Sequence, residues 1–580
     1  MPAHQAEHAD DYDGDQDQDQ RVLHQALALL AGMWPVRPAV AKHAGFNLLF
    51  YYLQSVNVRP RSAHPNVLKT VIGYAVPTPT VRAATTATAV AQGRLGPRTL
   101  FIGAVLIASL GTFVRPVTDG DFWWHVRAGR WIVEHGRLPG HDLFTYTVPD
   151  HRWIDSEYLT EVVMWLVRAR FGLAGVSIAF GLLAWSGFLL VALSARLRRQ
   201  PYVVVGLALG LAAVAGFPVW GARPQMVTFA LASLELLWLR GFLEGSGGIA
   251  GRAILWLPAL TAVWSNLHGG WPAGFLFLVI ALACCVLRWL GDRTNAEHLQ
   301  RARVLVLVGA ASAVTVLINP NGLAVYAYPL QTLTSAAQQG LIAEWQSPDF
   351  HLAALWAFEA MLLLVVAGLA FGKPALFDAL VVLAAAALAL ESVRHIALFV
   401  AAATPVLVTT WSDIWGRLAV RRFLPIAPPR RWLSAVTVGV LALVAVEVGS
   451  RTADDLGHQS ALISQTVPLG AADWLAAHPE VGTRMFNQYA WGGYLADRFY
   501  PDPNRRVFVF SEGVLMGDDL LLQYRQVAAG NPGWRDLLDR AGVDYVVFDS
   551  GSSLDEVLAA QSNWRLAYRD ATAVIYLRST

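Results

Sequence analysis

Two aspartates separated by one residue, Asp119 and Asp121, follow the first long apolar segment of the chain, residues 99–114. The run DGDFWWH continues from them through aromatic residues to His125. A carboxylate can remove a proton from a hydroxyl as a general base, and two neighbouring carboxylates can share a divalent cation such as Mg²⁺ or Mn²⁺. Acidic residues beside aromatic ones close to a membrane surface therefore indicate chemistry on a substrate that is held by lipid.

Further polar residues interrupt the sequence at the ends of later apolar segments. Charged residues in such places are costly in a membrane protein, which makes them candidates for function. Arginine and protonated histidine can bind a phosphate, and a carboxylate can orient an acceptor. The candidates are Glu157, Arg223, Asn266, His268, Asn319, Asn321, Glu344, Glu391, Arg394 and His395.

The acidic candidates also have structural interpretations. Asp121 could cap a helix over 122–135, and Asp155 could cap one over 156–170. Glu157 would then lie in the first turn of that second helix, where the helix dipole favours an acid. Capping by Asp121 would not exclude catalysis by the same carboxylate.

The basic candidates have structural interpretations as well. Arg223 and Arg394 could anchor the chain at the membrane interface, and His268 could satisfy a tight turn. These interpretations do not explain why polar groups from six separate regions gather at the same ends of the apolar segments. That one-sided arrangement favours a shared site.

The composition excludes several classes of protein. Only 15% of the 580 residues are charged, against about 25% in a typical soluble domain, and the mean hydropathy is +0.42. The apolar residues come in long runs, so we predict a polytopic membrane protein. The net charge of +2 gives no reason to expect a nucleic-acid partner. Cys284 and Cys285 are adjacent within an apolar run, where they predict neither a disulfide framework nor a zinc site.

The apolar runs predict eleven membrane spans, each near the ~20 residues that cross the hydrocarbon core. We place them at about 99–114, 172–194, 202–219, 224–240, 253–267, 271–288, 304–318, 352–371, 375–391, 395–412 and 433–449.

Basic residues orient these spans. Fifteen Lys and Arg residues fall in one set of connections, whereas the short connections on the other side hold only Arg223 and Arg394. Because basic loops stay in the cytoplasm, we predict a multi-pass protein of a bacterial plasma membrane with a cytoplasmic N-terminus. Loop 115–171 and the C-terminal tail would lie outside. The fifteen residues are Arg196, Arg198, Arg199, Arg240, Arg252, Arg288, Arg293, Arg301, Arg303, Lys373, Arg417, Arg421, Arg422, Arg430 and Arg431.

The chain divides into three predicted regions: a cytoplasmic region over 1–98, a transmembrane domain over 99–450 and a polar domain over 451–580. The acidic run at 10–20 predicts solvated disorder, because it lacks the glycine and the final glutamate of a calcium-binding loop. The acidic start and the missing cleavage signature argue against a signal peptide.

The tail alternates strand-like and helical patterns, which predicts a small, mainly parallel α/β layer. We expect the last two strands to form a hairpin at one edge, because a short turn at 570–571 joins them. The expected strands lie at 484–487, 506–510, 545–549, 565–568 and 573–577, and the expected helices at 469–478, 515–528, 532–541 and 553–561.

The ordered motifs resemble a group of bacterial polytopic proteins assigned to the GT-C superfamily of glycosyltransferases. DGDFWWHVRAGRWI and LPGHDLFTYT are similar to the first outer loop of that group, and WGGYL at 491–495 is similar to its outer C-terminal domain. WSNLHGG, NPNG, EWQSP and the Arg-His pair at 394–395 resemble its later motifs, so the resemblance covers about 100–580. The run after RRVFV departs from the group: it reads Phe510-Ser511-Glu512-Gly513 in place of an acidic-glycine-arginine turn.

The resemblance implies a multi-span transferase that uses a polyprenyl-phosphate-linked sugar on the outer leaflet. It implies that Asp119 and Asp121 are catalytic. Our leading hypothesis is an inverting glycosyltransferase that passes this sugar to a glycan, lipid or protein acceptor. Our hypothesis makes Asp121 the base or a metal ligand, Asp119 its partner, and Glu344 a residue that orients acceptor or ligand. Phosphate and substrate binding is assigned to His125, Glu157, Arg223, His268, Arg394 and His395.

The alternative is a non-enzymatic role, as a transporter of lipid-linked glycans or as a partner in envelope assembly. A transporter predicts polar residues near the bilayer midplane, often on broken helices. The polar candidates gather at one rim instead, which favours an enzyme. A serine hydrolase is disfavoured because no G-x-S-x-G turn is present.

Overall fold

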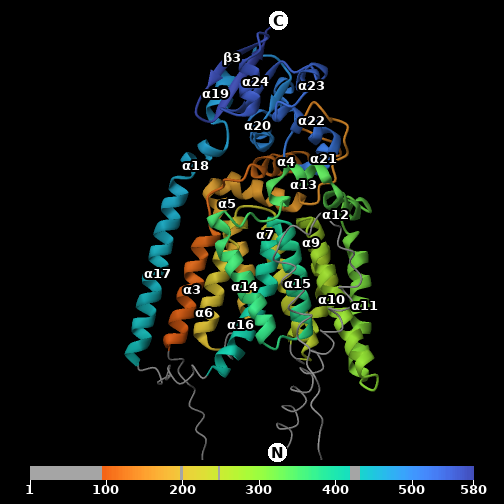
Figure 1. Ribbon diagram of the computed structural model, residues 1–580, viewed down its shortest axis with the longest axis vertical. Coiled ribbons are helices and arrows are strands. Elements are labelled where there is room, and N and C mark those ends of the chain that lie inside the picture. Colours follow the sequence, from red (N-terminus) through yellow and green to blue (C-terminus); the bar gives the residue numbers. More distant parts are fainter. Residues whose placement is uncertain (1–94, 196–199, 246–248, 419–430, 580) are drawn as a thin grey trace, which may run out of the picture. The chain divides into compact units, whose positions relative to one another are not determined.

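The computed structural model describes residues 95–195, 200–245, 249–418 and 431–579. The predictions made for the acidic run and for the rest of 1–94 lie outside these residues. Long helices run side by side through residues 97–457, and a small sheet follows them in the tail (Figure 1). The helices up to Gly457 are α3 (Pro97–Phe113), α4 (Asp121–His135), α5 (Tyr158–Ser194), α6 (Tyr202–Ala215), α7 (Gln225–Leu243), α8 (Ile249–Ala253), α9 (Leu257–Leu267), α10 (Pro272–Gly291), α11 (Ala296–Val316), α12 (Ala324–Thr334), α13 (Ala336–Leu341), α14 (Trp356–Phe371), α15 (Leu376–Glu391), α16 (Ile396–Arg417) and α17 (Arg431–Gly457).

Seven of the described helical segments are long and apolar enough to cross a membrane, which confirms a polytopic helical protein. Each of the eleven predicted spans coincides with a helix. Seven are among these segments, α14 together with the 3₁₀ turn Ala353–Leu355 before it, and the other four, α3, α6, α9 and α15, are shorter, with 11 to 17 residues. Hydropathy averages over turns and 3₁₀ segments that end a helix early, as at Phe217–Val219 after α6.

Small residues let the helices approach closely where the first loop meets the bundle. A Cβ atom built on Gly129 of α4 would lie 2.0 Å from the carbonyl oxygen of Glu161 in α5. One built on Gly187 of α5 would lie 2.8 Å from the Cα atom of Ala230 in α7. Such contacts are typical of helix pairs packed in membranes. They fix α4, which begins with Asp121, directly against the helix that follows Glu157.

The tail contains a four-stranded sheet in the order β1-β2-β4-β3. The strands are β1 (Met485–Asn487), β2 (Tyr545–Asp549), β3 (Trp564–Arg569) and β4 (Ala573–Arg578). The expected hairpin of the last two strands is confirmed, since β3 and β4 pair antiparallel with Leu566 opposite Tyr576.

The expectation of a mainly parallel sheet was wrong. Only β1 and β2 pair in parallel, and β4 lies antiparallel to both of its neighbours. The segment 506–510 is not a strand of this sheet. Its Val507 instead forms a β-bridge with Thr145 of the first loop. The backbone N–H and C=O of Val507 therefore hydrogen-bond to the first loop and not to a neighbouring strand of the sheet.

The four predicted tail helices are present, one of them with a break, and α18 (Gln459–Thr466) and α20 (Gly492–Phe499) were not predicted. The other tail helices are α19 (Leu469–Ala477), α21 (Gly513–Met516), α22 (Asp518–Ala528), α23 (Trp534–Arg540) and α24 (Ser553–Ala559). The helix predicted over 515–528 is interrupted at Gly517, which has a φ of 77°. This left-handed conformation favours glycine and ends α21 before α22 begins.

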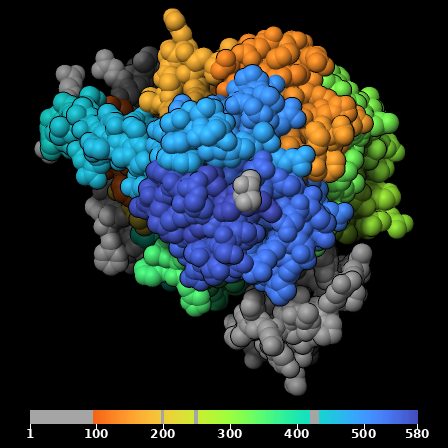
Figure 2. Space-filling model, turned by 90° about the horizontal axis from the view of Figure 1, so that it is seen from above, coloured from red at the N-terminus to blue at the C-terminus, as the bar shows by residue number. Residues whose placement is uncertain are grey.

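The first loop and the tail pack against each other. Asp497 of α20 pairs with Arg127 of α4 (Oδ1–Nε 3.2 Å) and with Arg168 of α5 (Oδ2–Nη1 2.8 Å). Its side chain is only 10% exposed, so little solvent screens the two ion pairs. In the view of Figure 2 the first loop, in orange, lies beside the tail, in blue. The loop that carries the paired aspartates is thus held between the helices and the tail.

Candidate active site

A cavity of about 360 Å³ lies where the first loop, the segment before α14, the Arg-His pair and the tail meet. Its size falls within the range of small-molecule sites, about 300–1,000 Å³. Six of the nine predicted site residues line it, namely Asp119, Asp121, His125, Glu157, Glu344 and Arg394. Segments hundreds of residues apart thus converge on one chamber.

The paired aspartates form the turn that opens α4. Asp119 Oδ1 accepts a hydrogen bond from the backbone N–H of Asp121 (3.1 Å), and the residue before the helix is Gly120. The alternative interpretation of Asp121 as the cap of this helix does not hold, because Asp119 accepts the free N–H and Asp121 is already helical. A Cβ atom on Gly120 would lie 2.5 Å from the carbonyl oxygen of Ala490, so only glycine fits between the two aspartates and the tail.

Arg223 joins two acids that line the cavity. Its Nε lies 2.7 Å from Asp119 Oδ2, and its Nη1 pairs with Glu344. Burial works against the charge of Arg223, but the two carboxylates outweigh it and raise its pKa above the usual value. Burial alone would raise the pKa of Glu344 too, yet Arg223 and Arg394 together lower it. Glu344 is therefore ionised, and Arg223 is neutralised by its neighbours.

Asp121 has a different environment from Asp119. Burial, followed by the charges of Asp119 and Glu344, raises the pKa of Asp121 to about 7. Burial also raises the pKa of Asp119, but the guanidinium in direct contact with it opposes the rise. No cation within the described ranges lies at ion-pair distance from Asp121. Two neighbouring carboxylates thus differ in their readiness to hold a proton, which is a common basis for separate roles in catalysis.

Arg394 presents a guanidinium to the same cavity. It lies in the 3₁₀ turn Val393–His395 before α16, and its Cζ atom is 4.7 Å from the ring centre of Trp345. Cation–π contact with tryptophan orients a guanidinium without neutralising it. Over the residues that the structure describes, no carboxylate forms an ion pair with Arg394. Its charge is therefore available to a ligand.

A buried network holds Glu157 in place. The Nδ1 atom of His268 accepts a hydrogen bond from the backbone N–H of Gly270 (3.0 Å) and is 2.6 Å from the hydroxyl of Thr228. Burial lowers the pKa of His268 to about 3, so its ring is neutral at pH 7. The proton must then reside on Nε2, which lies 3.3 Å from Glu157 Oε1. His268 is thus a neutral donor to Glu157, and the expectation that it is a cationic phosphate ligand does not fit.

Glu157 is itself close to His125. Their Oε2 and Nε2 atoms are 3.6 Å apart, and the other ring nitrogen of His125 is 2.9 Å from Glu161. Burial raises the pKa of Glu157 to about 8, and burial lowers the pKa of His125. A protonated Glu157 can donate a hydrogen bond to a substrate oxygen. His125, like His268, serves as a neutral partner of an acid and not as a cation.

The structure adds residues that the sequence interpretation missed. Glu512 lines the cavity, caps α21 through the N–H of Leu515 and accepts a hydrogen bond from the Tyr328 hydroxyl (3.2 Å). Burial raises its pKa to about 7. Glu512 belongs to the run that departs from the resembling group. A polar Ser-Glu-Gly triplet directly after the apolar run ending at Phe510 was the available signal.

Four buried polar atoms at the cavity lack hydrogen-bond partners among the described residues. They are Trp124 Nε1, Gln225 Oε1, Ser511 Oγ and the hydroxyl oxygen of Tyr489. Buried polar groups in native proteins are nearly always paired, so each unpaired one calls for an explanation. A polar ligand in the cavity would supply the missing partners.

Other predicted residues lie outside the cavity. His395 contacts Trp345 edge to face with ring centres 6.0 Å apart, and Glu391 is exposed. The asparagines support the turns behind the site: Asn266 accepts from the Tyr158 hydroxyl (2.6 Å), Asn319 donates to Ser265 and Asn321 donates to the carbonyl of Asp155. These side chains position backbone and do not face a ligand.

This chain is similar in fold, but only distantly in sequence, to three proteins of known structure. No protein family model and no curated protein matches the sequence. ArnT from Cupriavidus metallidurans, solved bound to undecaprenyl phosphate, is similar at 15% identity and a TM-score of 0.44, over 82% of this chain and 97% of its own. The oligosaccharyltransferase AglB from Archaeoglobus fulgidus, in complex with an inhibitory peptide and a dolichol-phosphate, is similar at 12% identity and a TM-score of 0.49, over 83% of this chain and 74% of its own. The arabinofuranosyltransferase AftD from Mycobacteria is similar at 16% identity and a TM-score of 0.40, over 84% of this chain and 42% of its own.

Two of the three are named as transferases, an oligosaccharyltransferase and an arabinofuranosyltransferase. The TM-scores are below 0.5 and the identities are low. The function proposed below therefore rests on the residues of the cavity and not on these likenesses.

Proposed function

We propose that the protein is an inverting membrane glycosyltransferase that moves a sugar from a polyprenyl-phosphate donor to a hydroxyl of an acceptor. One observation carries the proposal. The cavity holds Asp121, a carboxylate with no ion-pair cation, and Arg394, a guanidinium with no ion-pair carboxylate, counted over the described residues. A sugar phosphate together with an attacking hydroxyl would satisfy both groups at once.

Arg394 binds the phosphate of the donor. A guanidinium forms paired, charge-assisted hydrogen bonds with phosphate oxygens, and the contact with Trp345 sets the plane in which it does so. Arg223 stands behind the paired aspartates and is already occupied by Asp119 and Glu344. Its charge contributes at longer range, whereas Arg394 makes direct contact.

Asp121 acts as the general base. It takes the proton from the acceptor hydroxyl while that oxygen attacks the anomeric carbon. The bond from this carbon to the phosphate oxygen breaks, and polyprenyl phosphate leaves with the electron pair. A single displacement inverts the anomeric carbon. With a pKa of about 7, Asp121 is substantially ionised at neutral pH and still basic enough to accept a proton.

The remaining cavity groups hold the sugar. Glu157 and Glu512 carry protons more readily than ordinary carboxyl groups, with pKa values of about 8 and about 7. A carboxyl group that is partly protonated can both donate to and accept from sugar hydroxyls. The unpaired atoms of Trp124, Gln225 and Tyr489 add one donor, one acceptor and one group that does both. This inventory suits a ligand with several hydroxyl groups.

The donor set fits a divalent cation between Asp119 and Asp121 poorly. Asp119 Oδ2 already pairs with Arg223, and Oδ1 accepts the N–H of Asp121. Across the described part of the chain, no group of three or more His, Cys, Asp or Glu side chains could hold a metal ion. We therefore assign the neutralisation of the leaving phosphate to Arg394, with Arg223 behind it.

The site belongs to the outer face of the membrane in this proposal. The loop at 115–171 supplies the paired aspartates, and the loop at 319–350, which has no Lys or Arg, supplies Glu344. Both connections lie opposite the fifteen basic residues that mark the cytoplasmic side. A polyprenyl chain in the outer leaflet would then place its phosphate at the level of Arg394.

A transporter of lipid-linked glycans is the second candidate. It would place polar groups midway along broken spans. In this cavity the polar groups stand at helix ends: Asp121 is the first residue of α4, Glu157 directly precedes α5, and Arg394 lies just before α16. This placement at one rim favours chemistry on a head group over passage through the bilayer.

The test uses the full chain in proteoliposomes with a panel of undecaprenyl-phosphate-linked monosaccharides as donors and with oligosaccharides, lipids and serine- or threonine-containing peptides as hydroxyl acceptors. Release of undecaprenyl phosphate is measured for the wild type and for Asp121→Asn. We expect release with at least one donor and a loss of about 100-fold or more in the variant, as for removal of a general base.

Asp150→Asn is the matched control, because Asp150 is an exposed acid on the same loop. It should release undecaprenyl phosphate like the wild type. Equal rates for Asp121→Asn and the wild type would reject the catalytic assignment. Movement of labelled donor across the bilayer without any release would favour the transporter.

A further inference from the structure

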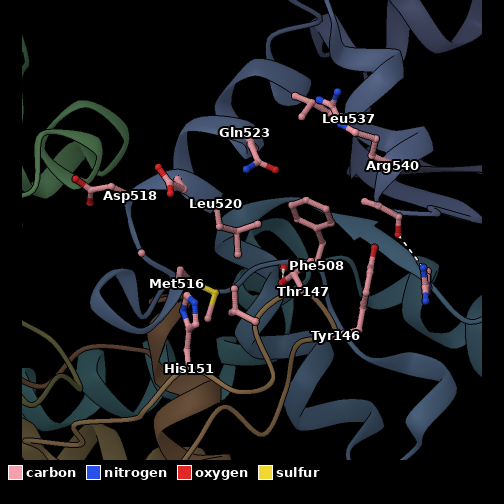
Figure 3. Close-up of a pocket in the computed structure, with 15 residues that line it drawn as sticks. Tyr146, Thr147, His151, Phe508, Met516, Asp518, Leu520, Gln523, Leu537 and Arg540 are labelled. Atoms are coloured by element: carbon pink, nitrogen blue, oxygen red, sulfur yellow. Dashed lines mark hydrogen bonds between the residues drawn. The ribbon is translucent and has the colours of Figure 1, made fainter.

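A second cavity, of about 580 Å³, lies between the first loop and the tail. Figure 3 shows its wall: Tyr146 and His151 come from the first loop, Phe508 and Met516 from the segments at the centre, and Arg540 from the end of α23. Tyr146 is held in position because its hydroxyl donates to the carbonyl of Met485 (3.1 Å). His151 is held by a hydrogen bond between its Nδ1 and Leu515 (2.8 Å). None of these residues belongs to the catalytic cavity.

The two cavities share a thin wall. Gly513 and Val514 of α21 line the catalytic cavity, whereas Met516 of the same helix lines the second one. A helix rises about 1.5 Å per residue, so these lining residues are separated by only a few ångströms along the helix axis. The next helix repeats the pattern, with Tyr524 on the catalytic cavity and Gln523 on the second. The two cavities are therefore close enough for one chain molecule of several units to occupy both.

The charges that line the second cavity balance. Arg484 and Arg540 contribute two positive charges, and Asp518 and Asp519 contribute two negative ones. A site for a phosphate or another anion would concentrate arginine or lysine. A site for a cation would concentrate carboxylates. The balanced lining instead suits a neutral ligand that both donates and accepts hydrogen bonds.

Several side chains at this cavity have bonding capacity to spare. The side chains of Asp519, Gln523 and Arg540 are exposed, and in the described structure no residue forms a hydrogen bond or an ion pair with them, so a ligand can reach all three. Together they offer an acid, an amide and a guanidinium. Tyr146 adds an aromatic ring, with Phe508 set edge to face at 6.1 Å. Planar polar groups beside an aromatic ring match a sugar, which has hydroxyl groups around its edge and C–H groups on its face.

We propose that the second cavity binds neutral sugar units of the acceptor, so that the acceptor is an oligosaccharide or polysaccharide and not a lipid or a protein. The acceptor role rests on the proposed glycosyl transfer in the neighbouring cavity. The terminal hydroxyl lies beside Asp121, and the preceding units lie over α21 and against Tyr146, Gln523 and Arg540. The tail domain then selects the acceptor, while the membrane helices hold the donor.

Binding is tested on the full chain in detergent, without donor, by calorimetric titration with neutral hexasaccharides of glucose, mannose, galactose and arabinose. We expect at least one of them to bind. The double variant Gln523→Ala with Arg540→Ala should bind it about 10-fold more weakly or worse, because two hydrogen-bonding side chains are lost. Leu537→Trp, which fills the cavity from α23, should abolish binding.

Arg535→Ala is the matched control, since Arg535 is an exposed arginine of the same helix that does not line the cavity. It should bind like the wild type. The proposal is overturned if none of the hexasaccharides binds, or if the double variant binds as the wild type does. Equal or tighter binding of an acidic hexasaccharide of galacturonic acid would also overturn it, because the ligand would then not be neutral.

The two proposals fail separately. Glycan binding without donor and release of undecaprenyl phosphate are measured independently on the wild type. If the wild type binds glycan but releases no undecaprenyl phosphate, the transferase proposal fails and the glycan site stands. If the wild type releases undecaprenyl phosphate but the double variant binds glycan normally, the glycan site fails and the transferase stands.

Discussion

At the scale of single residues, the site works through unequal acids. Asp121, Glu157 and Glu512 line one cavity, and burial raises the pKa of each, to about 7, about 8 and about 7. Of the three, only Asp121 is adjacent to the ion-paired Asp119, so its pKa is the one that the charge of Asp119 affects most directly. Its protonation should therefore govern the pH dependence of transfer.

The rate of transfer should rise as the pH increases through about 7. The base must be ionised to act, and a raised pKa keeps more Asp121 protonated below that pH. The measurement is kcat between pH 5 and pH 9 for the wild type and for Glu512→Gln. If Asp121 is responsible, the midpoint stays near 7 in the variant. A midpoint that disappears with Glu512 would assign the titration to Glu512.

Replacement of Arg394 by alanine should lower kcat/KM for the donor by about 10- to 100-fold, the range expected for the loss of hydrogen bonds to a charged group. Arg394→Lys should recover part of the loss, since lysine keeps the charge but not the paired geometry. Donor titrations in proteoliposomes measure both variants. Arg417→Ala, at the far end of α16, is the control and should leave the donor constants unchanged.

Chelation should leave activity intact. In this proposal arginine supplies the positive charge that neutralises the leaving phosphate, because both oxygens of Asp119 already have partners. The check is release of undecaprenyl phosphate after dialysis against EDTA, with and without added Mg²⁺ or Mn²⁺. Loss on chelation with recovery by either ion would return a divalent cation to the paired aspartates.

At the scale of elements, the position of α4 against α5 determines where the paired aspartates stand. Gly129→Ala should destabilise this contact by about 1–3 kcal/mol, since its new methyl group would meet the carbonyl of Glu161 at 2.0 Å. A thermal unfolding scan measures the loss as a lower midpoint. Gly140→Ala is the control, because a Cβ atom there meets nothing within 4 Å. An unchanged midpoint for Gly129→Ala would show that α4 can shift away from α5.

At the scale of the whole molecule, the tail closes the cavity over the first loop. Asp497→Asn removes the charge that pairs with both Arg127 and Arg168, and breaking a buried ion pair costs about 3 kcal/mol. We expect faster hydrogen–deuterium exchange in α4 and α20 together, and a lower rate of transfer. Asp473→Asn, which breaks the exposed pair with Arg498, should change neither. Exchange confined to α20 would mean that the tail and the loop are not coupled.

The sequence alone determined the class of the protein and much of its candidate site. Long apolar runs and few charges specify membrane helices, because a segment in hydrocarbon must satisfy its backbone hydrogen bonds internally. Charged residues at the ends of such runs are costly and therefore conspicuous. Asp119, Asp121, Glu344 and Arg394 could be named for this reason, and the structure brings all four to one cavity.

Only the tertiary structure decided what each group does. Periodicity cannot reveal that Asp119 takes the hydrogen bond at the start of α4 and leaves Asp121 without an ion-pair partner, or that His268 is neutral behind Glu157. The parallel sheet was wrongly predicted because the course of 506–510 depends on the first loop, which is distant in sequence. Glu512 and the second cavity arise from the same contact between loop and tail. The chemical types of the residues are local properties, whereas their partners, protonation and access depend on which distant segments pack around them.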